Sequence, residues 1–257
     1  MTRAQTITLA AAGALPGSMA AAGAVHLLSA VRPLKLDPYV YRIDGALFHF
    51  QPSFAMGNLL RMAPALKTAA YWCYVGLPVA MLAIVALYVA KGLPVAPLAR
   101  SLALCLFAAI PIYVAVPVAG PQYAFSNFPN PPAAVPAARI PIDAPPNGIP
   151  SVHFATAILL YLFARRCGRP AQILAWGFAL MTFGATLGFG EHYLTDLVLA
   201  VPYAALIYRA GKGTRESTRT PAPAAANAPT SLERDAEGQT ESTTSTPAPI
   251  IGLPARK

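Results

Sequence analysis

A series of apolar runs with almost no charge limits the folds available to this chain more than any other feature does. A run of roughly 20 apolar residues can cross the hydrocarbon core of a membrane as a helix. The chain is 56% hydrophobic and 11% charged, whereas soluble domains carry about a quarter charged residues. The short alternating segments of barrel strands are not evident. The sequence therefore predicts an all-α integral membrane protein.

Six such runs predict a six-helix transmembrane bundle. They cover residues 7–31, 69–90, 101–119, 151–163, 171–189 and 193–208. The first run is either an uncleaved span or a cleaved signal peptide, because Ala20, Ala21 and Ala22 offer small residues. Its apolar pattern continues through Leu28, which favours the span.

Three other regions do not fit a span. Residues 32–67 mix basic residues, carboxylates and aromatics, which is typical of an interfacial or re-entrant segment. Residues 120–148 are rich in proline and predict a surface loop. Residues 211–257 hold few large apolar side chains and predict a disordered tail. The expected organisation is a first span (1–31), a membrane domain (32–210) and a tail (211–257).

The net charge is +9, and the Lys and Arg residues lie mostly between the apolar runs. This placement indicates membrane orientation and anionic headgroups, and no nucleic-acid partner is expected. With the amino terminus inside, His153 and His192 lie at the outer ends of two different spans. Residues 32–67 are basic although they lie outside, which predicts that they bind a phosphate headgroup.

Two polar phrases at the ends of apolar runs are the candidate site. Ionisable groups at membrane depth are costly and are usually kept for function. In the second phrase, Gly190–Asp196, His192 and Asp196 are four residues apart and share one helix face. The carboxylate can hold one imidazole nitrogen as a donor and leave the other as a nucleophile.

The first phrase is Pro150-Ser151-Val152-His153. Proline and serine suit the start of a helix, whose free backbone amides attract anions. His153 at the edge of this anion site could donate a proton to a leaving oxygen. Together the phrases predict a nucleophilic imidazole, an anion site and an acid imidazole around one phosphate.

These phrases, with Asn147-Gly148-Ile149 before the first and Gly120–Phe125 upstream, resemble the type 2 phosphatidic acid phosphatase superfamily. The similarity covers residues 36–210. It is closest to the inositol phosphorylceramide synthase-like (inositolphosphotransferase) branch. The resemblance implies a six-helix bundle that cleaves or transfers phosphate esters without metal or cofactor. It implies that His192 forms a phosphohistidine, Asp196 orients it, His153 is the general acid, and Ser151 with the Val152 amide holds phosphate oxygens.

The sequence departs from the family pattern in two places. Ala185 and Thr186 stand where typical members have Ser-Arg, and the inositol branch commonly lacks that arginine too. Lys35 and Arg42 have the spacing of a Lys-x6-Arg-Pro motif, but Ile43 replaces its proline. Lys35, Arg42 and Arg139 are therefore the candidates for neutralising phosphate charge.

The predicted protein is a membrane lipid phosphatase or phosphotransferase acting on a phosphorylated lipid or polyprenyl substrate. Its acceptor is water or an alcohol such as inositol, and its expected location is a bacterial-type plasma membrane with the site on the outer face. Two alternatives are a non-catalytic transport or scaffold relative, and a haem protein with His153 and His192 as ligands. Asp44 either serves the site or is a solvated interfacial carboxylate.

Overall fold

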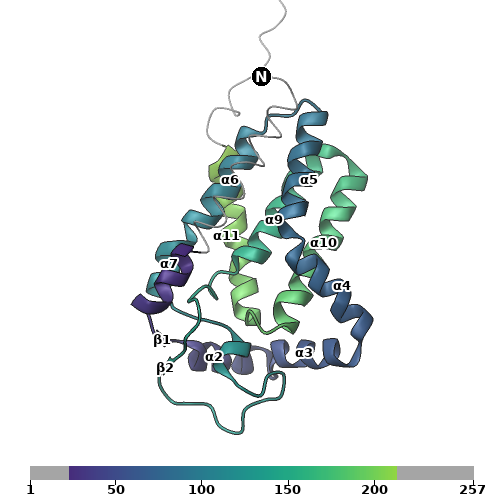
Figure 1. Cartoon of the computed structure of the whole chain (residues 1–257). Coiled ribbons are helices and arrows are strands. Elements are labelled where there is room, and N and C mark those ends of the chain that lie inside the picture. Colours follow the sequence, from purple (N-terminus) through teal and green to yellow (C-terminus); the bar gives the residue numbers. More distant parts are fainter. Residues whose placement is uncertain (1–22, 213–257) are drawn as a thin grey trace, which may run out of the picture. The chain divides into compact units, whose positions relative to one another are not determined.

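The computed structural model describes residues 23–212. The predicted tail, apart from its first two residues, and most of the first predicted span lie outside this range. Residues 23–31 are helical. The described part is mostly helical, as the sequence predicts, and its long helices run side by side (Figure 1).

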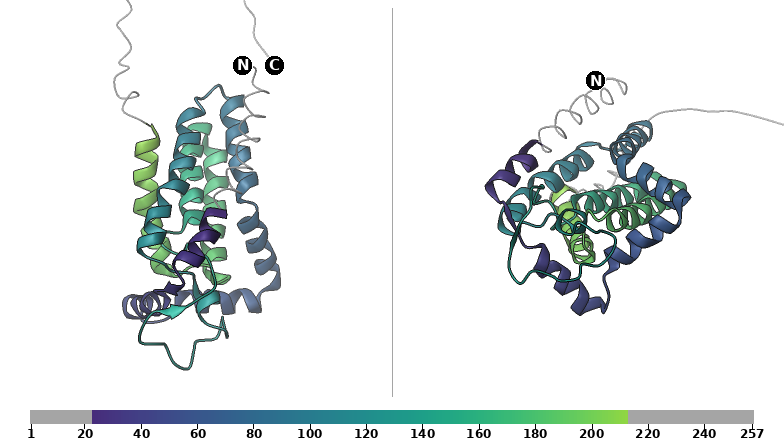
Figure 2. Two further views of the ribbon diagram at one scale, coloured as in Figure 1. Left: turned by 60° about the vertical axis from the view of Figure 1, so that its left-hand side comes forward. Right: turned by 60° about the horizontal axis from the view of Figure 1, so that its bottom comes forward.

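One central helix organises the bundle. This helix is α9 (Val152–Ala164), and it packs against its neighbours on several sides (Figure 2). The neighbours are α5 (Leu77–Ala90), α6 (Ala96–Phe107), α10 (Arg169–Gly188) and α11 (Leu194–Lys212). More than half of the α9 side chains are buried, including Leu159, Leu160 and Phe163. The first phrase of the candidate site thus begins a helix that the whole bundle encloses.

The structure supports three or four membrane spans within residues 23–212. Helices at Ala96–Ala115, which joins α6 to α7 (Ala109–Ala115), at Arg169–Gly188 and at Leu194–Lys212 are long and apolar enough to cross. A fourth would combine α4 (Pro64–Val75) with α5, which meet at 58°. Helix α9 has 13 residues, so it extends about 20 Å, less than the roughly 30 Å core. The six-span bundle stays a prediction.

The break between α4 and α5 has a local cause. Gly76 separates the two helices and Pro78 opens the second. Proline lacks the N–H that would bond to the carbonyl four residues earlier, which is that of Tyr74. The bend therefore leaves the Tyr74 carbonyl available to another donor.

The end of the bundle that holds both histidine phrases is covered by other elements. Helices α2 (Asp37–Phe48) and α3 (Pro52–Met62) lie across this end (Figure 1). Residues 120–148 form a long loop there, with the short helix α8 (Pro121–Ala124). Strand β1 (Leu34–Lys35) pairs antiparallel with β2 (Ile140–Pro141). Tyr41, Phe54, Phe125 and Phe128 join these parts through ring contacts.

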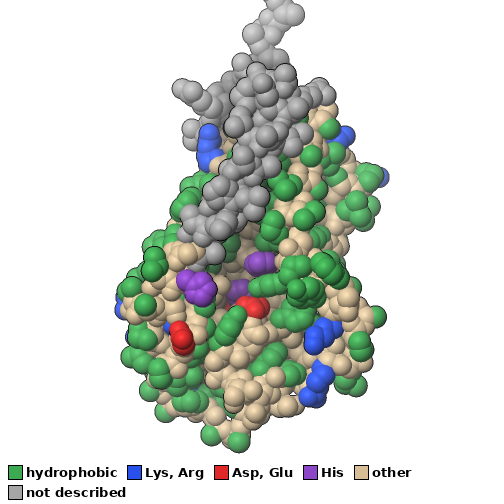
Figure 3. Space-filling model, in the orientation of Figure 1, with side chains coloured by type: hydrophobic (Ala, Val, Ile, Leu, Met, Phe, Trp, Pro, Cys, Tyr) green, Lys and Arg blue, Asp and Glu red, His purple; other side chains and the backbone are tan. Residues whose placement is uncertain are grey.

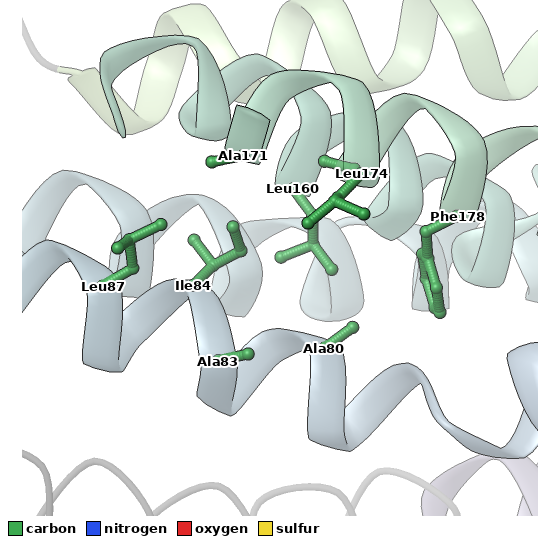
Figure 4. A pocket seen from close by; sticks show the side chains of 9 residues that line it. Ala80, Ala83, Ile84, Leu87, Leu160, Ala171, Leu174 and Phe178 are labelled. Atoms are coloured by element: carbon green, nitrogen blue, oxygen red, sulfur yellow. The ribbon is translucent and has the colours of Figure 1, made fainter. Parts of the chain in front are cut away.

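An apolar cavity of about 280 Å³ lies between α5, α9 and α10 (Figure 4). Its walls include Ile84, Leu160 and Phe178. Leu160 is seven residues beyond His153, or about two helical turns. The cavity is thus separate from the polar phrases. At the far end of α9, the 3-10 helix η1 (Arg165–Cys167) leads into α10.

Packing of α10 on α3 predicts a contrast between two glycines of α10. A Cβ at Gly188 would lie 2.3 Å from Leu60 Cδ1, whereas a Cβ at Gly177 meets nothing within 4 Å. We expect Gly188→Ala to lower the free energy of unfolding by about 1–3 kcal/mol. Gly177→Ala should leave it unchanged or raise it by about 0.5–1 kcal/mol. Denaturation in detergent micelles measures both, and equal effects would contradict the packing.

Candidate active site

The two histidine phrases meet because the starts of α9 and α11 adjoin. Ser151 caps α9, since its hydroxyl accepts from the Phe154 amide at 3.3 Å. The Ser151 amide in turn lies 3.5 Å from the carbonyl of Asp196. The charges of His153 and His192 are close enough to interact. Figure 3 shows histidine side chains beside an acidic side chain in a hollow of the surface.

The His192 ring is buried and held at Nδ1. That nitrogen lies 3.1 Å from the carbonyl oxygen of Gly148 and 3.4 Å from Asp196 Oδ2. A carbonyl oxygen only accepts, so Nδ1 carries the proton and Nε2 holds the lone pair. The predicted pairing with Asp196 is present, but the nearer partner is a carbonyl that sequence reasoning did not single out.

Gly148 is a glycine because the chain passes very close to Val118. A Cβ there would lie 2.7 Å from Val118 Cγ1, and the Gly148 amide donates to the Val118 carbonyl at 2.7 Å. This close approach fixes the direction of the Gly148 carbonyl, which faces His192. The Asn-Gly-Ile-Pro segment thus contributes an orienting group as well as the start of α9.

His153 is held by the break between α4 and α5. Its Nε2 lies 3.2 Å from the Tyr74 carbonyl that Pro78 leaves free, and its ring stacks on the Tyr74 ring with centroids 4.3 Å apart. The carbonyl again marks the bonded nitrogen as the donor, so the neutral ring has its lone pair on Nδ1. Sequence reasoning did not predict this contact, although the Gly76-Leu77-Pro78 interruption is a sequence signal from which the free carbonyl could have been inferred.

Two carboxylates satisfy the first amides of α11. Asp196 Oδ2 accepts from the Tyr193 amide at 2.9 Å. Asp44, from α2, accepts from the Leu194 amide at 2.8 Å and from both the amide and the hydroxyl of Thr195. Asp44 is fully buried, so the solvated interpretation of this residue is wrong. A distant helix thus supplies the cap of the helix that carries Asp196.

A third carboxylate ties the same turn to the loop. Asp37 accepts from the amides of Ala119 and Gly120 at 3.0 and 2.8 Å, and from the Tyr193 hydroxyl at 3.1 Å. Burial raises the pKa of Asp37 to about 6 despite these donors. Ser53 of α3 donates to the His192 carbonyl at 2.9 Å. The nucleophile candidate is therefore held through its ring, its carbonyl and its neighbours.

The three basic candidates lie elsewhere. Lys35 is buried and donates to the Arg32 carbonyl, and burial lowers its pKa. Arg42 donates to the carbonyls of Pro136 and Ala137 in the proline-rich loop, and Arg139 is exposed. Within residues 23–212 none of the three has a hydrogen bond or ion pair to either site histidine. Their role as phosphate ligands stays a prediction.

The predicted anion site at the start of α9 is already bonded in part. The Ser151 hydroxyl caps the helix, and the Val152 amide contacts the hydroxyl of Tyr113. Among residues 23–212, no group of three or more His, Cys, Asp or Glu side chains could hold a metal ion.

The positions of the missing Ser-Arg pair are filled by the protein core. Ala185 and Thr186 are fully buried. The Thr186 hydroxyl donates to the Thr182 carbonyl at 2.9 Å, and the Thr186 carbonyl accepts from the amides of Glu191 and His192. Thr186 therefore fixes the backbone at the site and leaves no space for an arginine side chain in this packing.

Within residues 23–212, the buried His192 ring has no hydrogen bond at Nε2 and lies near a second imidazole, His153, at one end of the helical bundle. The profile of the PAP2 superfamily matches residues 39–210. The chain belongs to this superfamily, which indicates a membrane phosphatase or phosphotransferase. Comparison with curated proteins gives no match, and neither does comparison with solved structures.

The buried cap predicts that Asp44→Ala destabilises the protein. The change leaves two amides at the start of α11 without their acceptor, which costs about 1–3 kcal/mol. Asp143→Ala is the matched control, because Asp143 is exposed on the loop. Denaturation in micelles should separate the two variants, and equal stability would contradict the capping role.

The raised pKa of Asp37 predicts a pH dependence of stability. Its folded pKa of about 6 exceeds the ordinary value of 3.8. The folded state therefore binds the proton more tightly, and this contribution is full below pH 3.8 and is lost as the pH rises through about 6. The loss is on the order of 3 kcal/mol. Asp37→Asn should flatten the slope of unfolding free energy over this range, and parallel curves would refute the assignment.

Proposed function

We propose that this protein is a membrane lipid phosphatase or phosphotransferase that works through a phosphohistidine on His192. The observation that carries the proposal is the fixed tautomer of His192. Gly148 and Asp196 both accept at Nδ1, so the Nε2 lone pair is available to a phosphorus atom. Asp196 also stabilises the positive charge that the ring gains during attack.

The reaction has two steps. Nε2 of His192 attacks phosphorus, the phosphorus–oxygen bond of the ester breaks, and His153 gives a proton to the leaving alcohol. Because Nε2 of His153 already donates to the Tyr74 carbonyl, the transferred proton comes from Nδ1 of the imidazolium. An acceptor then takes the phosphoryl group from His192. No metal ion takes part.

Phosphate oxygens would be held at the start of α9. Ser151 and the Val152 amide reach phosphate by giving up their present partners, the Phe154 amide and the Tyr113 hydroxyl. Lys35, Arg42 and Arg139 remain the proposed sources of positive charge, and each requires movement toward the histidines.

The substrate is proposed to be a phosphorylated lipid. The reaction is proposed to resemble that of inositolphosphotransferases. Support comes from the two histidine phrases, from the Gly120–Phe125 segment and from Ala185 and Thr186 in place of the usual pair. The acceptor is water or an alcohol such as inositol.

The site is proposed to lie on the outer face of a bacterial-type plasma membrane. Basic residues in the connections at the other end of the bundle support this orientation, whereas the basic residues 32–67 at the site end are exceptions to it. Lys91 follows α5, Arg100 lies in the first turns of α6, and Arg165 follows α9. Basic residues mark the inner side of membrane proteins.

The mechanism predicts that His192→Ala lowers turnover of a phosphorylated lipid by at least about 1,000-fold, because the nucleophile is lost. Radiolabelled phosphatidic acid and phosphatidylinositol in detergent micelles, with a chelator present, provide the assay. Label on the protein that is lost in acid and retained in base would identify phosphohistidine.

His26→Ala is the matched control, because His26 is exposed and, within residues 23–212, has no hydrogen bond or ion pair to either phrase. Turnover at the wild-type rate in His192→Ala would refute the assignment of His192 as the nucleophile. A wild-type protein that takes up no label and releases no product would favour the non-catalytic alternative.

A further inference from the structure

Glu191 immediately precedes His192 and is held by α8. Gln122 Nε2 donates to its Oε1, and the Tyr123 hydroxyl lies 3.3 Å from each carboxylate oxygen. The Gln122 amide also donates to the Gly190 carbonyl at 3.0 Å. Helix α8 therefore fixes both the side chain of Glu191 and the turn that carries it.

The turn itself is tightly packed. Gly120 has φ +124°, and a Cβ there would lie 2.3 Å from the carbonyl oxygen of Glu191. On the other side, the Glu191 amide donates to the Thr186 carbonyl at 3.1 Å. The carboxylate thus has a defined position relative to His192, as a group that acts on a reacting atom requires.

Glu191 lies near the groups that hold both site histidines. Its charge interacts with His192 and with Tyr74, the residue whose ring stacks on His153. The side chain is only partly buried. A carboxylate has about four lone-pair positions, and Gln122 and Tyr123 supply only two donors. Glu191 can therefore accept a further hydrogen bond from a bound group.

We propose that Glu191 binds the hydroxyl group of the acceptor that attacks the phosphohistidine. The inference rests on the proposed function and adds a residue to its second step. The acceptor oxygen forms a bond to phosphorus, the bond from phosphorus to Nε2 of His192 breaks, and its electron pair returns to that nitrogen. The acceptor proton moves to Glu191, which releases it to solvent, while His153 regains a proton from solvent.

The electrostatic setting suits this role. Burial raises the pKa of Glu191, which makes its carboxylate a stronger base. Hydrogen bonds from Tyr123 and Gln122 keep the carboxylate in place, and burial outweighs the lowering of its pKa by the His192 charge and by these two bonds. A hydroxyl donor fits the remaining acceptor positions, and water and an alcohol share that chemistry.

Glu191→Gln tests the proposal, because glutamine keeps the shape and one acceptor oxygen but cannot take a proton. Radiolabelled phosphatidic acid and phosphatidylinositol in micelles are the probes, and the readout is the fraction of protein labelled at steady state beside the turnover rate. We expect turnover to fall about 100-fold while the labelled fraction rises several-fold. Glu191→Asp, which keeps the base, should recover part of the turnover.

Parallel reactions with water alone and with added inositol or glycerol distinguish the acceptors. Faster loss of label with an alcohol in the wild type, absent in Glu191→Gln, identifies an alcohol. If Glu191→Gln slows the loss of label equally in water alone, the acceptor is water. Turnover and labelling that fall together, or an unchanged variant, would overturn the role of Glu191 while the labelled wild type still supports the mechanism. A wild type that takes up no label and releases no product would overturn both proposals.

Discussion

The site depends on buried carboxylates that accept the first backbone amides of α11. The starting turn of a helix has amides with no helical acceptor, and at a buried position each needs a partner. Asp196 serves Tyr193, and Asp44 serves Leu194 and Thr195. Because Asp44 lies on α2, a segment across the end of the bundle fixes the turn that presents His192.

Each imidazole of the candidate site is oriented by a carbonyl that an interruption of the backbone makes available. Close packing at Val118 directs the Gly148 carbonyl to His192, and Pro78 leaves the Tyr74 carbonyl to His153. A carbonyl oxygen can only accept, so the orientation of each ring and the nitrogen that donates to the backbone are set before any substrate binds. The interruptions that shorten or bend the helices therefore serve the chemistry as well as the fold.

The groups around the two histidines are mainly hydrogen-bond acceptors and include few positively charged side chains. Asp196 and Glu191 flank His192, and the positions of the absent Ser-Arg pair are buried in the core. This balance separates the site from one built to grip a highly charged phosphate with arginine. In the proposed mechanism, helix amides, a charged imidazole and a carboxylate that receives a proton therefore act on the phosphate in place of the arginine.

The sequence by itself determined the helical membrane class, the superfamily, and the likeness of two phrases to halves of one phosphate site. Apolar length and the four-residue spacing of His192 and Asp196 are local properties, which one stretch of chain displays. Only the tertiary structure decided the contacts of Asp37, Asp44, Gly148, Tyr74 and Glu191, and the separation of Lys35, Arg42 and Arg139 from the histidines. Those contacts join segments far apart in the chain, and their formation depends on packing and on which backbone groups lack partners.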